Sequence, residues 1–237
     1  MPGATALVPA AGISKRMGGT EYKQFLTLGD KPLLAHTLLK LQACPLIKDI
    51  YLIVPASKIE YCQQEIVFRY QLDKVVEVVK GGEERQDSVY LGFISIKKGA
   101  DIVLIHDGVR PFIDTRLLEE VIKGSEEHGA CVSGIPCFDT IKQVDTQGTV
   151  QQTLPRHFLW QIHTPQAFNY QILKEALEKA REEGYYATDE ASLVERTGYP
   201  VKVVKGFPYN IKITSPPDLV IGEALLATLA RYREHKA

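Results

Sequence analysis

An apolar run that ends in a loop of small residues constrains the fold most. Residues 4–8 form a short apolar run that is typical of a buried strand. The chain then breaks at Pro9 and continues through three small residues, Ala10, Ala11 and Gly12. Small residues let a ligand approach the backbone closely, and Gly12 can adopt a positive φ angle. The pattern therefore predicts a strand that leads into a ligand-binding loop.

Cations follow this loop at short intervals. Lys15 and Arg16 lie just beyond it, and Lys23 follows a few residues later. Backbone N–H groups and cations together can hold a polyphosphate, although an ordinary turn with solvated cations has a similar composition. The Walker pattern does not match, because it ends in Gly-Lys-Ser/Thr. The dinucleotide fingerprint does not match either, because Ser14 stands at its second glycine position.

Short apolar runs alternate with segments of helical periodicity along most of the 237 residues. The expected strands after the first cover residues 50–54, 74–80, 102–105, 130–136, 201–205 and 210–214. The expected helices cover residues 32–43, 58–70, 85–96, 115–128, 165–183, a shorter segment from 188, and a final segment from 215 to about 233. This alternation predicts a Rossmann-like α/β fold, with a mostly parallel sheet and helices on both faces. The length predicts a single domain over residues 1–237.

Residues 139–156 break this alternation. Two stretches that alternate between polar and apolar residues flank Gln147-Gly148, which predicts a two-stranded hairpin. The hairpin has little apolar content for a core of its own, and an isolated hairpin is marginally stable in water. We therefore expect a protruding arm at about residues 137–158 that packs on a second copy of the chain. The alternative is a hairpin that lies on its own domain.

Composition and charge exclude several classes of protein. A net charge of −1 gives no general attraction to nucleic acid or to an anionic membrane. No apolar run approaches the roughly 20 residues of a membrane span, and the N-terminus lacks the pattern of a signal peptide. The four cysteines have neither Cys-x-x-Cys spacing nor histidine partners at zinc-site spacing. We expect reduced thiols in a cytoplasmic protein.

Asp107 follows the expected strand at 102–105, at the carboxyl edge where open α/β sheets bind ligands. A carboxylate at this position commonly contacts Mg²⁺ or a ribose. Arg110 lies three residues later. The alternative is an ordinary turn that Asp107 caps, with Arg110 as its ion-pair partner. His106 is expected to order the loop beside Asp107.

Several other polar residues are candidates for contacts with a ligand. Gly81-Gly82 leads into a helix start that includes Glu83 and Ser88, where exposed N–H groups can read a base edge or hold an anion, although a simple strand-to-helix loop has a similar sequence. Lys212 is out of phase with its apolar neighbours and faces solvent or a cleft. Thr188 can offer its hydroxyl to a phosphate or act as a plain N-cap.

Cations and backbone amides dominate these candidates, and no nucleophile can be inferred from sequence order. The histidines do not have metal-site spacing either. This set of residues suits phosphoryl or nucleotidyl transfer, where the substrate brings the nucleophile and the protein positions it and neutralises charge.

Nine motifs in order resemble those of one enzyme family. They are Pro9-Ala-Ala-Gly-x-x-x-Arg16-Met, Lys23-Gln-Phe-Leu, Gly81-Gly-x-x-Arg-x-Asp-Ser88, His106-Asp-x-x-Arg110-Pro, Asp139-Thr140-x-Lys, Arg156-x-x-Leu-Trp160, Thr164-Pro-Gln-x-Phe168, Thr188-Asp-Glu-Ala-Ser192 and Asn210-Ile-Lys212-x-Thr214. Together they resemble the 2-C-methyl-D-erythritol 4-phosphate cytidylyltransferases of the non-mevalonate isoprenoid pathway. These belong to the cytidylyltransferase branch of the nucleotidyltransferases that form sugar nucleotides.

The resemblance implies a homodimer that joins CTP to 2-C-methyl-D-erythritol 4-phosphate and releases pyrophosphate. It implies catalytic roles for Arg16, Lys23, Arg156 and Lys212. It implies nucleotide contacts from Ala10, Ala11, Gly12, Gly82, Glu83, Ser88 and Asp107. It implies acceptor contacts from Arg110, Thr140 and Thr188, with Thr140 and Arg156 reaching in from the partner's arm. Because CTP carries about four negative charges, we also expect a divalent cation, Mg²⁺, with Asp107 as a candidate ligand.

The sequence departs from the family pattern at two places. Family members often have Asp at position 83, where this chain has Glu, and Val-Asp-Arg is usual where it has Leu154-Pro155-Arg156. Tyr209-Asn210-Ile-Lys also resembles the ribitol 5-phosphate cytidylyltransferases, which are therefore an alternative. A non-catalytic nucleotide-binding protein on the same fold is a second alternative.

Overall fold

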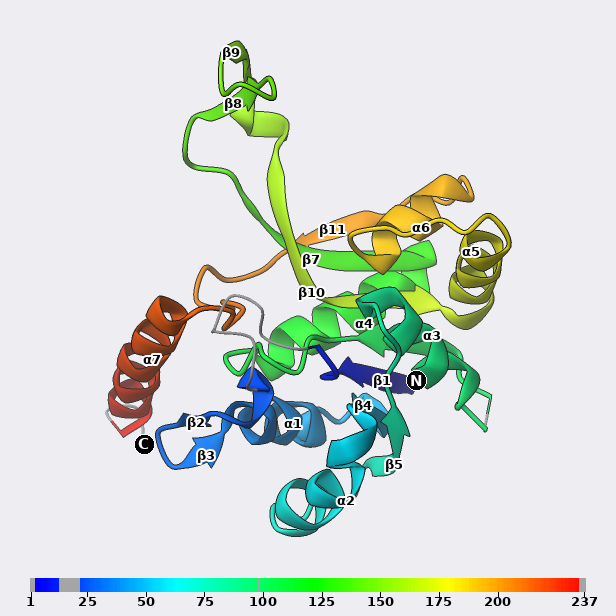
Figure 1. Ribbon diagram of the computed structural model, residues 1–237, viewed down its shortest axis with the longest axis vertical. Coiled ribbons are helices and arrows are strands. Elements are labelled where there is room, and N and C mark those ends of the chain that lie inside the picture. Colours follow the sequence, from blue (N-terminus) through cyan, green and yellow to red (C-terminus); the bar gives the residue numbers. More distant parts are fainter. Residues whose placement is uncertain (1–2, 13–21, 98, 235–237) are drawn as a thin grey trace.

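The computed structural model describes residues 3–12, 22–97 and 99–234 (Figure 1). Its main sheet has seven strands in the order β11-β7-β10-β6-β1-β4-β5. These strands are β1 (Ala4–Pro9), β4 (Ile47–Val54), β5 (Val75–Lys80), β6 (Ile102–Ile105), β7 (Ala130–Pro136), β10 (Trp160–Asn169) and β11 (Lys202–Lys205). Within this sheet β10 runs antiparallel to both of its neighbours, and the other pairings are parallel. The structure confirms the predicted mostly parallel α/β sheet.

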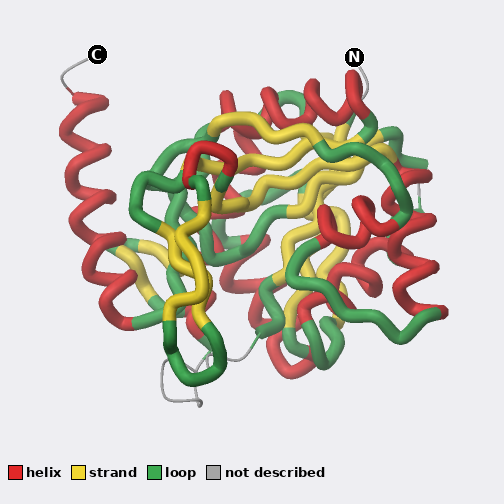
Figure 2. The backbone as a smooth tube through the Cα atoms, turned by 90° about the horizontal axis from the view of Figure 1, so that it is seen from above, coloured by secondary structure: helices red, strands yellow, loops and turns green. Residues whose placement is uncertain are grey.

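Helices cover both faces of the sheet (Figure 2). One face carries α1 (Leu33–Ala43), α4 (Thr115–His128) and α2 (Ile59–Tyr61), the last continued by the π-helical segment η4 (Cys62–Phe68). The other face carries α3 (Arg85–Ile94), α5 (Tyr170–Glu182) and α6 (Glu190–Arg196). A smaller apolar cluster holds α7 (Pro216–Glu234) against the short pair β2 (Thr27–Leu28) and β3 (Lys31–Pro32) at the margin of the molecule.

The central strand β1 shows how both faces are buried. Ala6 and Val8 pack into the cluster that contains Leu38 of α1, and Leu7 packs into the opposite cluster with Phe93 of α3. All three β1 side chains are fully buried. Successive strand residues point to opposite faces, so an uninterrupted apolar run is what a doubly covered strand requires.

The helix predicted over residues 165–183 is wrong in its first five residues, which belong to β10. Gln166 pairs with Ile105 of β6 on one side and with Val132 of β7 on the other. Pro165 lies at an irregularity of the β7 ladder, where its missing N–H group costs no ladder hydrogen bond. The helix α5 begins only at Tyr170, after the side chain of Asn169 caps its first N–H groups.

The strand predicted over residues 210–214 is also wrong. This segment is irregular and lies beside the loop that follows β6, where Ile213 donates its N–H to the carbonyl of Val109 at 3.0 Å. The carboxylate of Asp218 accepts from the N–H groups of Thr214 and Ser215 at 2.8 Å each, which caps the start of the last helix. The helix predicted over residues 58–70 is replaced by α2 and η4.

The predicted hairpin is confirmed and projects from the body of the molecule (Figure 1). It consists of β8 (Ile141–Val144) and β9 (Val150–Leu154), followed by the short 3₁₀ turn η5 (Arg156–Phe158). Large apolar side chains on the arm are exposed, with Phe138 at 68% and Phe158 at 75%. Contact of the arm with a second copy stays a prediction. No helix in the described ranges has the length and apolar character needed to cross a bilayer.

Candidate active site

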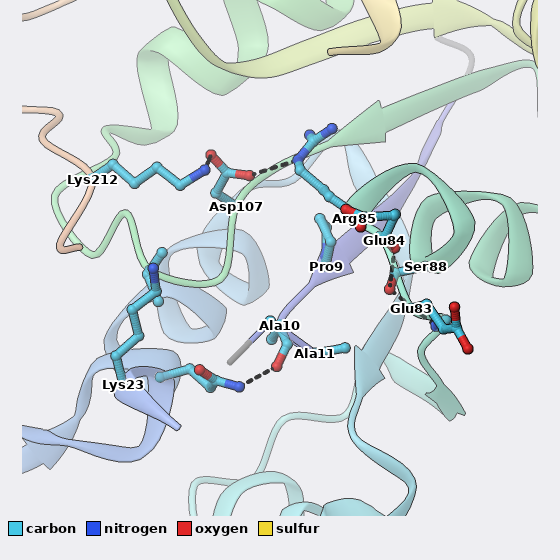
Figure 3. Close-up of a pocket in the computed structure, with 14 residues that line it drawn as sticks. Pro9, Ala10, Ala11, Lys23, Glu83, Glu84, Arg85, Ser88, Asp107 and Lys212 are labelled. Atoms are coloured by element: carbon cyan, nitrogen blue, oxygen red, sulfur yellow. Dashed lines mark hydrogen bonds and ion pairs between the residues drawn. The ribbon is translucent and has the colours of Figure 1, made fainter. Parts of the chain in front are cut away.

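Loops from several strands meet at the carboxyl edge of the sheet and form a pocket (Figure 3). Ala10 donates its N–H to the carbonyl of Ile53 at 2.7 Å, and Gly108 donates to the carbonyl of Pro9 at 3.2 Å. These bonds hold the loop after β1 between the ends of β4 and β6. The predicted site residues that line the pocket are Ala10, Ala11, Gly12, Lys23, Gly82, Glu83, Ser88, Asp107 and Lys212.

Close packing of small residues shapes one wall of the pocket. A Cβ atom on Gly81 would lie 2.3 Å from the Cβ of Ala11, so the glycine turn touches the first loop directly. The hydroxyl of Ser88 accepts from the N–H of Gly82 and donates to the carbonyl of Glu84, both at 3.1 Å. These hydrogen bonds fix the turn at residues 82–88 internally, and the packing of Gly81 on Ala11 places the turn beside the first loop, at the position predicted to hold a nucleotide.

Asp107 lies at the centre of the polar side of the pocket. Its N–H group donates to the hydroxyl of Thr164 at 3.0 Å, which fixes the backbone after β6. Among the described residues, its carboxylate contacts three cations: Nζ of Lys212 at 3.0 Å, Nε of Arg110 at 3.3 Å and Nε of Arg85 at 3.4 Å. Figure 3 shows Lys212 and Arg85 reaching the carboxylate from opposite sides.

Burial and charge act in opposite directions on Asp107. Burial alone raises the pKa of its carboxyl group, but Lys212, Arg85 and Arg110 outweigh this and hold the pKa well below its ordinary value. Burial lowers the pKa of His106 to about 4, so this imidazole is neutral at pH 7. Its ring nitrogens lie 3.2 Å from the hydroxyl of Thr164 and 3.3 Å from the carbonyl of Arg110. His106 thus orders the loop beside Asp107, as predicted.

The ion pair between Arg85 and Glu190 was not predicted from the sequence. Nη1 of Arg85 lies 2.8 Å from both carboxylate oxygens of Glu190, and the Glu190 side chain is 1% exposed. A signal was present, because Glu190 shares a helical face with the buried residues Leu193 and Val194. A charged residue at a core position almost always has a partner.

Lys23 belongs to the 3₁₀ turn η2 (Lys23–Phe25), which hydrogen bonds to the first loop. The buried side chain of Gln24 donates to the carbonyl of Ala10. This contact places the turn, and with it Lys23, at the pocket across from Asp107 (Figure 3). Arg16, predicted to be catalytic, lies outside the described residues.

Some predicted site residues do not line this pocket. Arg110 is buried behind Asp107 and donates Nη1 to the carbonyl of Asn210 at 2.7 Å. Thr188 is exposed ahead of α6, whose N-cap is Asp189. Thr140 and Arg156 are exposed on the arm, where Nη1 of Arg156 donates to the carbonyl of Phe138 at 2.5 Å.

The residues present provide one central carboxylate for a cation. Within the described parts of the chain, no group of three or more His, Cys, Asp or Glu side chains could hold a metal ion. Mg²⁺ at nucleotide sites is usually bound by one or two carboxylates together with substrate phosphates. Asp107 therefore suits a metal ion whose other ligands come mainly from a polyphosphate. In the parts of the chain that the structure describes, it does not belong to a metal site that is built from protein ligands alone.

A pocket at the carboxyl edge of a mostly parallel sheet, with backbone loops on one side and cations on the other, is typical of α/β enzymes that bind nucleotides. Comparison with known proteins narrows this class. Residues 4–228 match the family described as 2-C-methyl-D-erythritol 4-phosphate cytidylyltransferase. The chain belongs to this family.

Relatives of the same name cover nearly the whole chain. The enzyme of Syntrophus aciditrophicus is 46% identical over 225 residues, which covers 95% of this chain and 96% of that relative. The enzyme of Geotalea uraniireducens is 48% identical over 232 residues, with 97% and 99% covered. Among solved structures, the 4-diphosphocytidyl-2C-methyl-D-erythritol synthase of Anaerococcus prevotii superposes with a TM-score of 0.85 at 28% identity, covering 95% of this chain and 99% of that one.

Proposed function

We propose that this chain transfers CMP from CTP to 2-C-methyl-D-erythritol 4-phosphate, in the synthesis of isoprenoid precursors by the non-mevalonate pathway. An oxygen of the acceptor phosphate attacks the α-phosphorus of CTP and forms a new P–O bond. The bond from the α-phosphorus to the bridging oxygen breaks, and pyrophosphate leaves with its electron pair. The products are 4-diphosphocytidyl-2-C-methyl-D-erythritol and pyrophosphate. The family match over residues 4–228 carries this proposal.

The loops of small residues suit the nucleotide. We assign contacts with the cytidine and its phosphates to Ala10, Ala11, Gly12, Gly82, Glu83, Ser88 and Asp107. The exposed position of Glu83 supports a contact through its backbone at least as well as one through its carboxylate. The tight packing of Gly81 against Ala11 supports a preformed binding wall.

The cations suit the charge that develops in the reaction. In-line attack builds negative charge on the oxygens of the α-phosphate, and preorganised cations lower its energy. We assign this role to Arg16 and to Lys23, which lines the pocket, and we assign Lys212, which also lines it, to the acceptor phosphate. The ammonium group of Lys212 forms an ion pair with Asp107, and it can exchange this carboxylate for an acceptor phosphate.

We propose Mg²⁺ as the divalent cation, with Asp107 as its ligand from the protein. The ion would neutralise phosphate charge and help orient the triphosphate. Chelation by EDTA should abolish turnover, and added Mg²⁺ should restore it. Full turnover in rigorously chelated buffer would contradict this assignment.

We propose that two copies of the chain form a homodimer through the arm at residues 137–158. The exposed phenylalanines of the arm support a buried contact with another copy. Thr140, Arg156 and Arg110 would then take part in acceptor binding along with Thr188, with Thr140 and Arg156 supplied by the partner.

The fold supports one domain over the whole chain, because the main helices pack on one sheet. Four free cysteines are compatible with the cytoplasm, where we place the protein.

A panel of acceptors tests the reaction and its specificity. Pyrophosphate release from CTP is followed with 2-C-methyl-D-erythritol 4-phosphate, with ribitol 5-phosphate and with no acceptor. We expect turnover that depends on the first acceptor, because the relatives carry its name. A higher kcat/KM with ribitol 5-phosphate would assign the chain to that alternative, and no turnover with any acceptor would favour a non-catalytic nucleotide-binding protein.

A further inference from the structure

The ion pair between Glu190 and Arg85 connects two helices beneath the pocket. Glu190 is the first residue of α6 and Arg85 is the first residue of α3. Nη1 of Arg85 contacts both oxygens of Glu190 at 2.8 Å, and only 1% of the Glu190 side chain is exposed. A buried carboxylate needs such a partner, because an isolated buried charge is costly. Removing either member should therefore change where the other one lies.

The same guanidinium also contacts Asp107. Its Nε lies 3.4 Å from Oδ1 of Asp107, whereas Lys212 and Arg110 both contact Oδ2. The two oxygens of Asp107 thus face different cations. Arg85 approaches Asp107 through a single, long contact because its short contacts are directed to Glu190.

We infer that Glu190 is a positioning residue that acts on the pocket through Arg85 and Asp107. A guanidinium prefers a bidentate pair with a carboxylate. Without the charge of Glu190, the available carboxylate partner for Arg85 in this network is Asp107. A bidentate pair would turn the Asp107 carboxylate toward Arg85 and away from Lys212 and the bound nucleotide. This inference rests on the proposed function, in which Asp107 contacts CTP and its Mg²⁺.

Further contacts hold this arrangement in place. Gln86, next to Arg85, donates its side-chain amide to the carbonyl of Tyr185 at 2.9 Å and accepts from the N–H of Ala187 at 2.9 Å. The segment that leads into α6 is therefore fixed to the start of α3. Because that segment contains Thr188, the same contacts join the proposed acceptor side of the pocket to its nucleotide side.

Neutral replacement of Glu190 tests the inference against a matched control. Glu190→Gln keeps the shape of the side chain and removes its charge. Glu183→Gln removes the same charge from an exposed pair with Arg196, which has a similar contact of 2.7 Å. We expect Glu190→Gln to weaken calorimetric binding of CTP in the presence of Mg²⁺, and to lower kcat, by at least about tenfold. The control should stay within about twofold of wild type.

A double-mutant cycle separates positioning from a general structural role. Calorimetric binding of CTP with Mg²⁺ is measured for wild type, Glu190→Gln, Asp107→Asn and the double variant. If Glu190 acts through Asp107, its replacement should change affinity by less than about twofold in the Asp107→Asn background. An equal loss in both backgrounds, or no loss in the wild-type background, would overturn the inference.

Arg85→Lys is the second test variant, to be used if Glu190→Gln does not fold. Arg85→Lys keeps the positive charge and loses the planar fork that contacts Glu190 and Asp107 together. Its effect on affinity should likewise disappear in the Asp107→Asn background, and persistence of the effect would contradict the inference. Binding of CTP needs no turnover, so the two proposals can fail separately. If CTP binding shows the expected coupling between Glu190 and Asp107 but no product forms, the proposed reaction is wrong and the inference stands.

Discussion

Replacement of Asp107 by Asn should destabilise the protein by about 3 kcal/mol, the lower end of what breaking a buried ion pair costs. The structure shows why the cost is not larger. After the change Arg85 keeps Glu190, and Lys212, whose side chain is 35% exposed, can reach water. Arg110, whose side chain is 9% exposed, keeps the carbonyl of Asn210. This buried cation is then left without a carboxylate partner among the residues that the structure describes.

Urea denaturation at pH 7 measures this difference in the free energy of unfolding. Glu77→Gln is the matched control, because it removes a carboxylate from a pair with Lys97, whose side chain is 77% exposed. We expect the control to lose less than about 1 kcal/mol. A loss below about 1 kcal/mol for Asp107→Asn as well would refute the reasoning.

The loss of unfolding free energy in Asp107→Asn should depend on pH, and the direction of this dependence tests the electrostatic contribution of Asp107. The pKa of Asp107 is lowered in the folded state from an ordinary value of 3.8. Its contribution to stability is therefore fully present above that value and is lost as the pH falls below it toward the lowered pKa of the folded state. The gap between wild type and Asp107→Asn should shrink on acidification below about pH 4. A gap that widens there would contradict the account.

Three further variants probe the pocket and the arm. Lys23→Ala should lower kcat by roughly two to three orders of magnitude, and a kcat within about twofold of wild type would remove Lys23 from the mechanism. Gly81→Ala would place a Cβ 2.3 Å from that of Ala11, so the KM for CTP should rise by about tenfold or more. Gly99→Ala is the control, because a Cβ there meets nothing within 4 Å. Equal KM values for the two variants would show that the two loops move apart at no cost to CTP binding. Co-refolding Arg156→Ala with Lys23→Ala chains should restore one working site in each heterodimer; activity no greater than the sum of the separate variants would show that Arg156 does not serve the partner.

Local sequence patterns predicted most of the sheet and its covering helices. The helix at residues 115–128 ends where expected, because Gly129 adopts a φ of +83°. Such helix-end signals involve only a few neighbouring residues, so they can be recognised in the sequence before the fold is known. The strand β10 could not be predicted in this way, because residues 166–168 pair with a strand on each side that is distant in the sequence, and Pro165 lies at an irregularity of one ladder.

The site was predictable in part for the same reason. Asp107 and the first loop follow apolar strands, so their place at the sheet edge follows from local order. Contact between Arg85 and Glu190 joins residues 105 positions apart, and no periodicity of the sequence relates them. Lys212 was predicted to face either solvent or a cleft; it lines the pocket, from an irregular segment rather than from a strand.

Phosphorus NMR of the reaction mixture tests the central claim most directly. The protein is incubated with CTP, Mg²⁺ and 2-C-methyl-D-erythritol 4-phosphate, and the spectrum is followed over time. We predict loss of the triphosphate signals, with equal growth of a coupled pair of diphosphate diester signals and of free pyrophosphate. Release of inorganic phosphate with CDP, or an unchanged spectrum of CTP and acceptor, would contradict the assignment of this chain as a cytidylyltransferase.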